Sequence, residues 1–154
     1  MRKFIVLSIV LLMLVGFAIT SSADVVTLYA DQDIDVGTLT VVVDGDNLVV
    51  TYAISSPWVL GDTHLYVGTV APTKSAPGQF PYGPEDAFVG VYTIPLADFS
   101  GATTLYIAAQ AEVTHSTEID PDTGVLREET AWAEGDEIRP GKNWAMYFTF
   151  TVPE

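Results

Sequence analysis

The chain has 154 residues, no cysteine, and 20 acidic against 6 basic side chains, which gives a formal net charge of −14. This length suits a single domain, and the lack of cysteine excludes disulfides, thiol catalysis and thiolate metal sites. An acidic surface repels phosphate backbones and anionic lipids, so nucleic-acid binding and membrane-surface binding are both disfavoured. Divalent cations and basic partners are attracted instead.

The first 23 residues have the form of a secretory signal peptide. Two basic residues precede an apolar run over residues 4–19, and small residues at Ser21 and Ala23 favour cleavage before Asp24. An uncleaved anchor and a pilin-type leader are the alternatives, whereas a lipoprotein is excluded because its lipidated residue is a cysteine. Cleavage leaves residues 24–154 with a net charge of −16, because two cations are removed. We therefore predict a product that is secreted or held at the cell surface, with no membrane association after cleavage.

The mature chain has a hydrophobic period of two, which indicates β-strands rather than helices. Strands at residues 38–43 and 48–54 flank the turn sequence Asp-Gly-Asp-Asn, which predicts a hairpin. Segments 71–84 and 116–136 are rich in turn residues and are predicted as loops. Further strands are predicted at residues 25–30, 63–69, 88–95, 103–114 and 145–152. This spacing predicts one all-β domain over residues 24–154, an antiparallel β-sandwich of jelly-roll-like or immunoglobulin-like form.

Two acidic segments are candidate calcium sites. Alternate side chains of an extended strand share a face, so an extended segment at residues 31–35 places three carboxylates together. Hard oxygen ligands at alternating positions in a turn suit Ca²⁺, although neither segment has the spacing of an EF-hand. The alternative is a solvated edge whose charges oppose aggregation. The candidate ligands are Asp31, Asp33 and Asp35 in the first segment, and Asp120, Asp122 and Glu128 in the second.

Four aromatic residues are candidates for a carbohydrate-binding surface: Trp58, Tyr82, Trp132 and Trp144. Aromatic faces stack on sugar rings, and neighbouring carboxylates bond the hydroxyl groups. The alternative is that these residues anchor the core or the loops, each with its polar tip satisfied, which is their commonest use.

The two histidines show no HxH or HExxH spacing that would indicate a metal site. His64 is predicted to be a hydrogen-bonded structural residue in a strand, and His115 closes a strand. No arrangement of Ser, His and Asp indicates nucleophilic catalysis, so we predict a protein that is not an enzyme.

Four strings form a recognisable set: GDTHLYVG at residues 61–68, PGQFPY at 77–82, ETAWAEG at 129–135 and GKNWAMYF at 141–148. The set resembles segments of uncharacterised exported domains of bacteria and archaea, over residues 60–151. The resemblance implies a secreted β-rich domain and no particular activity.

These observations favour a non-enzymatic extracellular domain that is structural, adhesive or self-assembling at the cell surface. The segment Val25–Ala30 lies directly behind the predicted cleavage site and can pair with its own sheet or with that of a neighbouring copy. Pairing with a neighbour is strand donation, which makes a second copy of the chain one expected partner. The alternatives are a carbohydrate-binding module, with a glycan as partner, and a calcium-stabilised extracellular domain.

Overall fold

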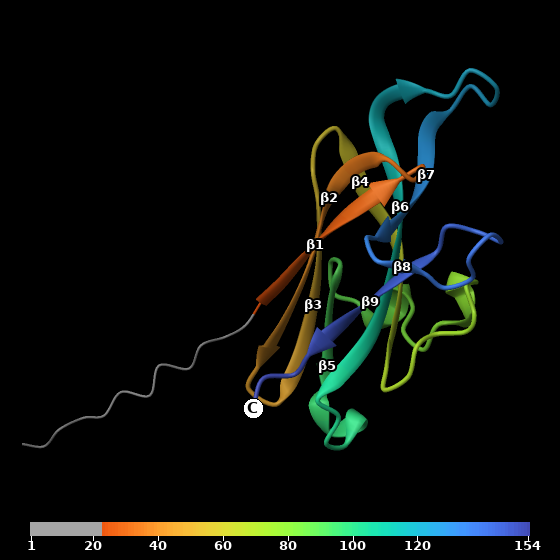
Figure 1. Ribbon diagram of the computed structural model, residues 1–154. Helices are drawn as coiled ribbons and strands as arrows, with labels where there is room; N and C mark the ends of the chain where they lie inside the picture. Colours follow the sequence, from red (N-terminus) through yellow and green to blue (C-terminus); the bar gives the residue numbers. More distant parts are fainter. Residues whose placement is uncertain (1–22) are drawn as a thin grey trace, which may run out of the picture.

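The computed structural model describes residues 23–154, which form antiparallel β-strands (Figure 1). Within these residues the helices are three short 3₁₀ turns, η1 (Pro77–Gln79), η2 (Pro84–Asp86) and η3 (Leu96–Phe99). The all-β, antiparallel prediction is confirmed, whereas the two-layer sandwich stays a prediction. The strands are β1 (Ala23–Ala30), β2 (Ile34–Asp44), β3 (Asn47–Ile54), β4 (Trp58–Gly68), β5 (Val91–Pro95), β6 (Thr104–Ile119), β7 (Leu126–Ala133), β8 (Asp136–Glu137) and β9 (Met146–Thr151).

The longest strand, β6, organises the sheet. Ala111 of β6 has Thr63 of β4 on one side and Ala131 of β7 on the other, so β6 is a central strand. On the side of β6 that pairs with β7, the strand β9 pairs with the beginning of β6. The strand order is β5-β3-β2-β1-β7-β6-β9-β8, with β4 attached to the free side of β6.

The β5–β3 end of this strand order meets the edge strand β4 across the main core. Tyr52 of β3 donates its hydroxyl hydrogen to the backbone oxygen of His64 on β4, at 3.2 Å. The hydroxyl oxygen of Tyr92 on β5 lies 2.8 Å from Thr63 Oγ1, also on β4. The sheet therefore curls so that side-chain hydrogen bonds, not a strand ladder, join its ends. Fully buried members of the enclosed core include Leu28, Leu39, Val50, Val113 and Phe150.

A second, smaller core covers part of the outer face of β6 and β7. Ala108 and Trp132 point to this side, opposite to Ala109 and Ala131, because successive strand residues face opposite ways. The connections at residues 71–83 and 134–145 fold over this face. Gly135 permits the second of them, because a Cβ atom there would lie 2.0 Å from the backbone oxygen of a residue on β9.

The structure corrects the sequence prediction at two places. The predicted loop at 116–136 contains the end of β6 and the whole of β7, whose core-facing side chains are only alanines at its buried end. Conversely, the predicted strand at 88–95 begins with a two-residue turn closed by hydrogen bonds between Phe88 and Val91. Val89 and Gly90 in that turn both have positive φ, +50° and +74°. Alternation failed at β7 because small and charged residues carry a weak hydrophobic signal.

The predicted cleavage site falls at the start of β1. This strand begins at Ala23, so a cut before Asp24 removes only its first residue. Residues 1–22 of the predicted signal peptide lie outside the described part of the chain. Within residues 23–154, no helix is both long enough and apolar enough to span a membrane.

Candidate ligand-binding groove

An open groove runs over the outer face of β4, β6 and β7. It consists of two cavities of about 470 and 530 Å³ that share Glu112 and Thr130. We call the first, between the two folded-over connections, the aromatic half, and the second the acidic half. The aromatic half is lined chiefly by His64, Gln110, Trp132, Asn143 and Trp144, and the acidic half by Asp62, Glu112, Thr114, Glu128 and Thr130.

The ladder of the sheet explains why these residues share a face. Gln110 of β6 pairs with His64 of β4 and with Trp132 of β7, which forms one row across three strands. The next outward-facing row joins Glu112 to Thr130, because residues two apart on a strand point the same way. The floor of the groove is therefore fixed by strand register, and the two connections form its walls.

The floor of the aromatic half is polar and only partly satisfied. His64 Nδ1 donates a hydrogen bond to Gln110 Oε1 at 2.9 Å, which is the structural role expected of this histidine. Gln110 is 2 % exposed, yet its amide nitrogen has no hydrogen-bond partner among residues 23–154. In that part of the chain, every side-chain nitrogen or oxygen that is shielded from solvent has a hydrogen-bond partner. The Gln110 amide nitrogen has none, so it is in contact with the solvent of the groove. His64 Nε2 is likewise left as an acceptor in the neutral ring.

Two tryptophans line the aromatic half in different ways. Trp132 is 4 % exposed and packs edge-to-face against Phe80 at 6.0 Å, so it belongs to the floor. Trp144 is half-buried and lies on the connection before β9. Asn143 Nδ2 donates to Ser75 Oγ at 2.7 Å, which ties the two walls of the groove together.

The acidic half is shaped by a β-bulge in β4. Gly61 and Asp62 together stand opposite Glu112, because the pairing of β4 with β6 shifts between residues 60 and 63. A Cβ atom at Gly61 would lie 3.1 Å from the backbone oxygen of Glu112, so the close approach favours glycine. Bulges of this kind re-aim side chains and are common beside functional sites.

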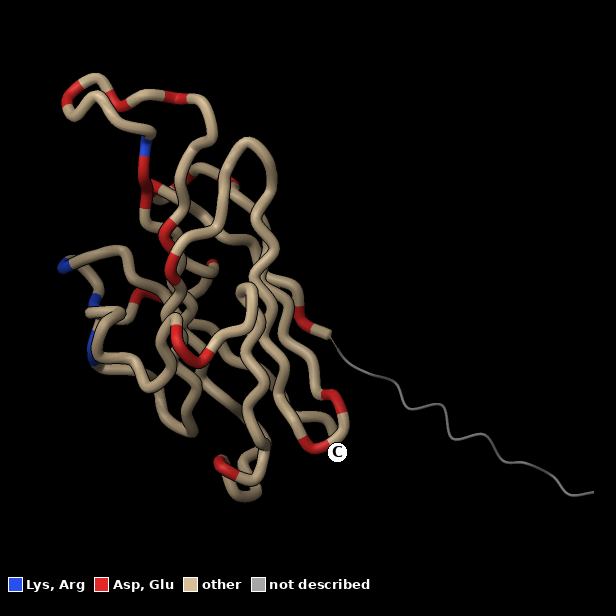
Figure 2. Tube along the Cα trace, turned by 180° about the vertical axis from the view of Figure 1, so that it is seen from behind, with Lys and Arg blue, Asp and Glu red and all other residues tan. Residues whose placement is uncertain are grey.

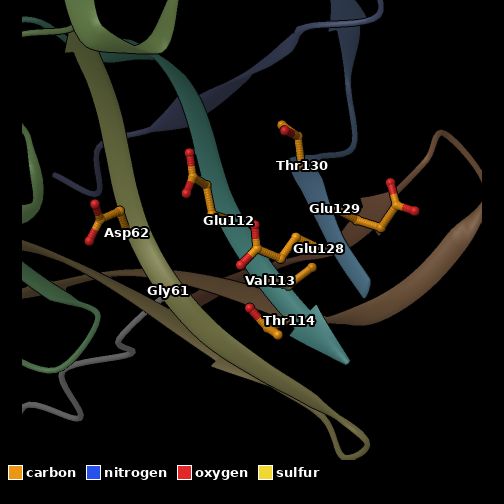
Figure 3. Close-up of a pocket in the computed structure, with 8 residues that line it drawn as sticks. All are labelled: Gly61, Asp62, Glu112, Val113, Thr114, Glu128, Glu129 and Thr130. Atoms are coloured by element: carbon orange, nitrogen blue, oxygen red, sulfur yellow. The ribbon is translucent and has the colours of Figure 1, made fainter. Parts of the chain in front are cut away.

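The carboxylates of the acidic half differ in their pairing. Figure 3 shows that Glu129 points away from Glu112 and Glu128. Glu129 Oε1 instead accepts a hydrogen bond from Arg127 Nε at 2.8 Å. Asp62, Glu112 and Glu128 form no ion pair within residues 23–154.

Three of the four basic residues of the described chain lie at the other end of the groove, where Glu134, Asp136 and Glu137 balance their charge. Lys74, Arg139 and Lys142 lie on the two connections that flank the aromatic half, and Figure 2 shows these blue segments grouped on one side of the molecule. The fourth basic residue of the described chain, Arg127, pairs with Glu118 and Glu129. The charge of the molecule is therefore distributed unevenly along the groove.

The four predicted aromatic residues separate into two groups. Trp132 and Trp144 come together in the groove, but Trp58 and Tyr82 do not line it. Trp58 is 8 % exposed, with His115 edge-on at 5.0 Å and the Arg127 guanidinium carbon 5.6 Å from its ring centre. Tyr82 pairs with Leu65 at the edge of β4, and burial raises the pKa of its hydroxyl. Trp58 and Tyr82 are therefore structural anchors.

The first acidic segment does not adopt the extended form that the calcium hypothesis assumed. Asp31 and Asp33 lie in the turn between β1 and β2, where Asp31 has a positive φ of +44°. Asp35 Oδ1 accepts a hydrogen bond from the backbone N–H of Gly37 at 3.0 Å. A turn of this kind does not align three carboxylates on one strand face.

The second acidic segment is also divided. Asp120 Oδ1 accepts hydrogen bonds from the backbone N–H groups of Asp122 and Thr123, and these bonds lower the pKa of Asp120. Glu128 lies on β7 in the groove. Residues 23–154 contain no group of three or more His, Asp or Glu side chains placed to hold a metal ion. Calcium binding stays a prediction.

The segment predicted for strand donation is an inner strand of its own sheet. All of β1 pairs with β2, and Leu28–Ala30 also pair with β7. Donation to a neighbouring copy requires this strand to leave those partners, so it stays a prediction.

Comparison with known proteins adds no relative. No family model matches the chain, and no curated protein or solved structure matches it. A functional role for the groove is therefore inferred from its geometry alone.

Sequence reasoning missed several groove residues, above all Gln110, Glu112 and Asn143. A usable signal exists in the sequence at residues 108–114, where polar residues at 110, 112 and 114 alternate with apolar ones. A strand buried on one face and polar on the other has this pattern. The sequence pattern of β6 does not indicate that β4 and β7 are the strands that pair with it.

Proposed function

We propose that this protein is an exported, non-enzymatic domain that binds carbohydrate in the groove over β4, β6 and β7, and so acts as an adhesive domain at the cell surface. The observation that supports this most strongly is the half-buried Trp144 beside the His64–Gln110 pair. A sugar ring has an apolar face that stacks on an aromatic ring, and hydroxyls that both donate and accept hydrogen bonds.

The polar groups of the floor match this chemistry. The Gln110 amide offers N–H donors, His64 Nε2 offers an acceptor, and the Thr130 hydroxyl serves as either. An apolar ligand that covered the open Gln110 amide would bury it without a partner, at a cost of about 1–3 kcal/mol, so a ligand hydroxyl is favoured. Mixed donors and acceptors on a nearly rigid strand face suit hydroxyl groups better than a uniformly charged ligand.

A panel of soluble oligosaccharides tests the proposal by isothermal titration calorimetry. We expect binding by the wild-type protein and a loss of about tenfold or more in affinity for Trp144→Ala, equivalent to about 1.4 kcal/mol. Phe88→Ala is the matched control, because Phe88 is 81 % exposed and does not line the groove. The absence of binding across the panel, or an equal loss in both variants, contradicts the proposal.

Two further measurements test the remaining parts of the proposal. N-terminal sequencing of the protein recovered outside the cell is expected to begin at Asp24, and retention of residues 1–23 contradicts cleavage there. A bound oligosaccharide is expected to keep its length on prolonged incubation. Shorter products would show that the domain is an enzyme.

Self-association is a second candidate, favoured by an open strand edge beside the cleavage site. Residues 23–26 of β1 pair with β2 on one side, and the ladder to β7 begins only at Leu28. Val25 on this edge is 63 % exposed. A lysine on an exposed edge opposes strand addition, so Val25→Lys is expected to reduce any oligomer seen by analytical ultracentrifugation. A wild-type protein that remains monomeric at high concentration excludes this candidate.

A further inference from the structure

The turn before β5 carries two apolar side chains that do not pack into either core. Phe88 is 81 % exposed and Val89 is 82 % exposed, more than any other large apolar side chain among residues 23–154. Backbone hydrogen bonds between Phe88 and Val91 close the turn, and the Gly90 backbone oxygen accepts a further one from the Tyr52 N–H. A well-bonded turn therefore holds these two side chains outward. We call Phe88 and Val89 the apolar tip.

The backbone of the turn gives no reason for a valine at the apolar tip. Val89 and Gly90 have φ angles of +50° and +74°, the conformation of a two-residue turn that favours Asn-Gly. A β-branched residue is disfavoured at positive φ. Strain of this kind persists chiefly at functional positions, where the side chain serves binding instead of folding. The apolar tip therefore has the properties of a contact surface.

A cavity that fits an aromatic ring lies elsewhere on the surface. It has a volume of about 190 Å³, and its walls are chiefly apolar, with Tyr66, Val70, Pro72 and Phe80 among them. The Tyr66 hydroxyl donates a hydrogen bond to the Val70 backbone oxygen at 2.8 Å, so this polar group is already satisfied. A cavity of about 150 Å³ accommodates benzene, so this one has room for a phenylalanine ring. We call it the Tyr66 cavity.

The charges beside the two surfaces are complementary. Lys74 is the only charged residue that lines the Tyr66 cavity, and it has no ion pair within residues 23–154. Glu85 and Asp86 are exposed and lie just before the apolar tip in the chain. An apolar tip beside two acids therefore matches an apolar cavity beside one cation. The same two acids oppose docking of the tip on an anionic lipid surface.

The apolar tip does not fill the cavity of its own chain, because Phe88 remains largely exposed. The turn is bonded to β3, whereas Phe80 of the Tyr66 cavity packs against Trp132 in the smaller core. Contact between the two surfaces therefore joins two copies of the chain through different patches. Such head-to-tail contacts close into rings or continue as filaments.

We infer that the apolar tip of one copy inserts into the Tyr66 cavity of a second copy, with Lys74 beside Glu85 and Asp86. A second copy of this chain is then the partner, and the contact repeats from copy to copy. The inference goes beyond the proposed function, because no residue of the Tyr66 cavity or the apolar tip lines the carbohydrate groove. It also uses surfaces separate from the open edge of β1.

Sedimentation velocity of the protein recovered outside the cell tests the inference. Physiological ionic strength is used, because it screens the repulsion between acidic copies beyond about 8 Å. We expect reversible association that increases with concentration. The tip variant Phe88→Ser and the cavity variant Val70→Glu are each expected to weaken it about tenfold or more. Val59→Ser is the matched control, because Val59 is 54 % exposed and lies in neither surface, and it should associate like the wild type.

An equal mixture of the two variants tests the head-to-tail geometry. The cavity variant keeps an intact tip, and the tip variant keeps an intact cavity, so one interface forms between them. We expect each variant alone to be monomeric and the mixture to form dimers and nothing larger. Circular dichroism confirms that both variants are folded. A mixture that associates no more than its components overturns the inference.

Three further outcomes would also overturn it. The first is a wild-type protein that stays monomeric at every concentration. The second is association that persists in Phe88→Ser and is lost in Val25→Lys, which assigns it to the edge of β1. The third is binding of the monomer to neutral phosphatidylcholine vesicles that Phe88→Ser abolishes, which assigns the apolar tip to a lipid surface. Oligosaccharide titration is a separate measurement, so carbohydrate binding stands or fails independently of these results.

Discussion

The two faces of β6 and β7 share one backbone but differ in what their side chains accomplish. On the inner face, Ala109, Ala111 and Val113 are fully buried and pack into the main core. On the outer face, the intervening positions hold Gln110 and Glu112, which border an open groove. The inner residues are apolar and packed, whereas the outer ones present an amide and a carboxylate to the groove. Local departures of this kind concentrate at functional sites.

The largest expected effect is on the inner face. Phe150 of β9 is fully buried in the main core, so Phe150→Ala is expected to lower the free energy of unfolding by about 3–5 kcal/mol. Urea denaturation followed by tryptophan fluorescence measures the change. Thr149→Ala, at the exposed neighbouring position, should change stability by less than about 0.5 kcal/mol. A loss below about 1 kcal/mol for Phe150→Ala would show that this core is loosely packed.

The next effect concerns the hydroxyl contacts that join the two ends of the sheet. The Tyr92 hydroxyl lies 2.8 Å from Thr63 Oγ1 and within 3.1 Å of two backbone oxygens, so Tyr92→Phe leaves buried polar groups unpaired. We expect a loss of about 1–3 kcal/mol in the same denaturation assay. Tyr106→Phe is the control, because no hydrogen bond of its hydroxyl is present among the described residues. Equal losses would contradict a specific role for the Tyr92 contacts.

Alkaline pH should weaken the same closure. Burial raises the pKa of Tyr52 well above its usual value of 10.0, and burial also raises that of Tyr92. Because the folded pKa exceeds the unfolded one, this stability is fully present below about pH 10 and is lost as pH rises toward the folded pKa. The expected loss is up to about 1.4 kcal/mol per pH unit for each tyrosine. Tyr52→Phe should flatten the decline measured between pH 9 and 11, and an unchanged slope would contradict this account.

A smaller effect, of opposite sign, is expected at the turn before β5. Val89 is 82 % exposed and has a φ of +50°, a region that β-branched residues disfavour. Val89→Asn creates the Asn-Gly pair that such two-residue turns prefer, with no packing lost. We expect a gain of about 1 kcal/mol, measured as a higher midpoint of denaturation. A loss of stability would show that Val89 makes contacts that support the sheet.

The smallest effect is expected on the outer face. Glu112→Gln removes a carboxylate that has no ion pair in the described chain, so the free energy of unfolding should change by less than about 0.5 kcal/mol. An unchanged stability would separate the two faces, because Phe150 on the inner side is needed for the fold and Glu112 is not. A destabilisation above about 1 kcal/mol would assign Glu112 to the fold instead.

The sequence predicts the inner face far better than the groove. The hairpin of β2 and β3 was predictable because strong alternation surrounds a recognisable turn. Strand β7 was not predictable, because only Ala131 and Ala133 face the main core and the rest of the strand is rich in charged residues. The acidic half of the groove depends on a bulge in β4 and on the register of three strands. Both the bulge and the register depend on pairing between strands that are distant in the sequence. Patterns within single segments therefore do not predict that Asp62, Glu112 and Glu128 come together.

The grouping of the basic residues gives the molecule a direction as well as a charge. Lys74, Arg139 and Lys142 lie on one side of a molecule whose remaining charge is almost wholly negative (Figure 2). Such a distribution is an electric dipole, because this side is close to neutral while the rest of the molecule is strongly negative. The mouth of the aromatic half lies between the connections that carry these residues. Beside any negatively charged surface the molecule as a whole is repelled, but this less negative side turns toward the surface, and added salt removes the orientation before it affects the fold.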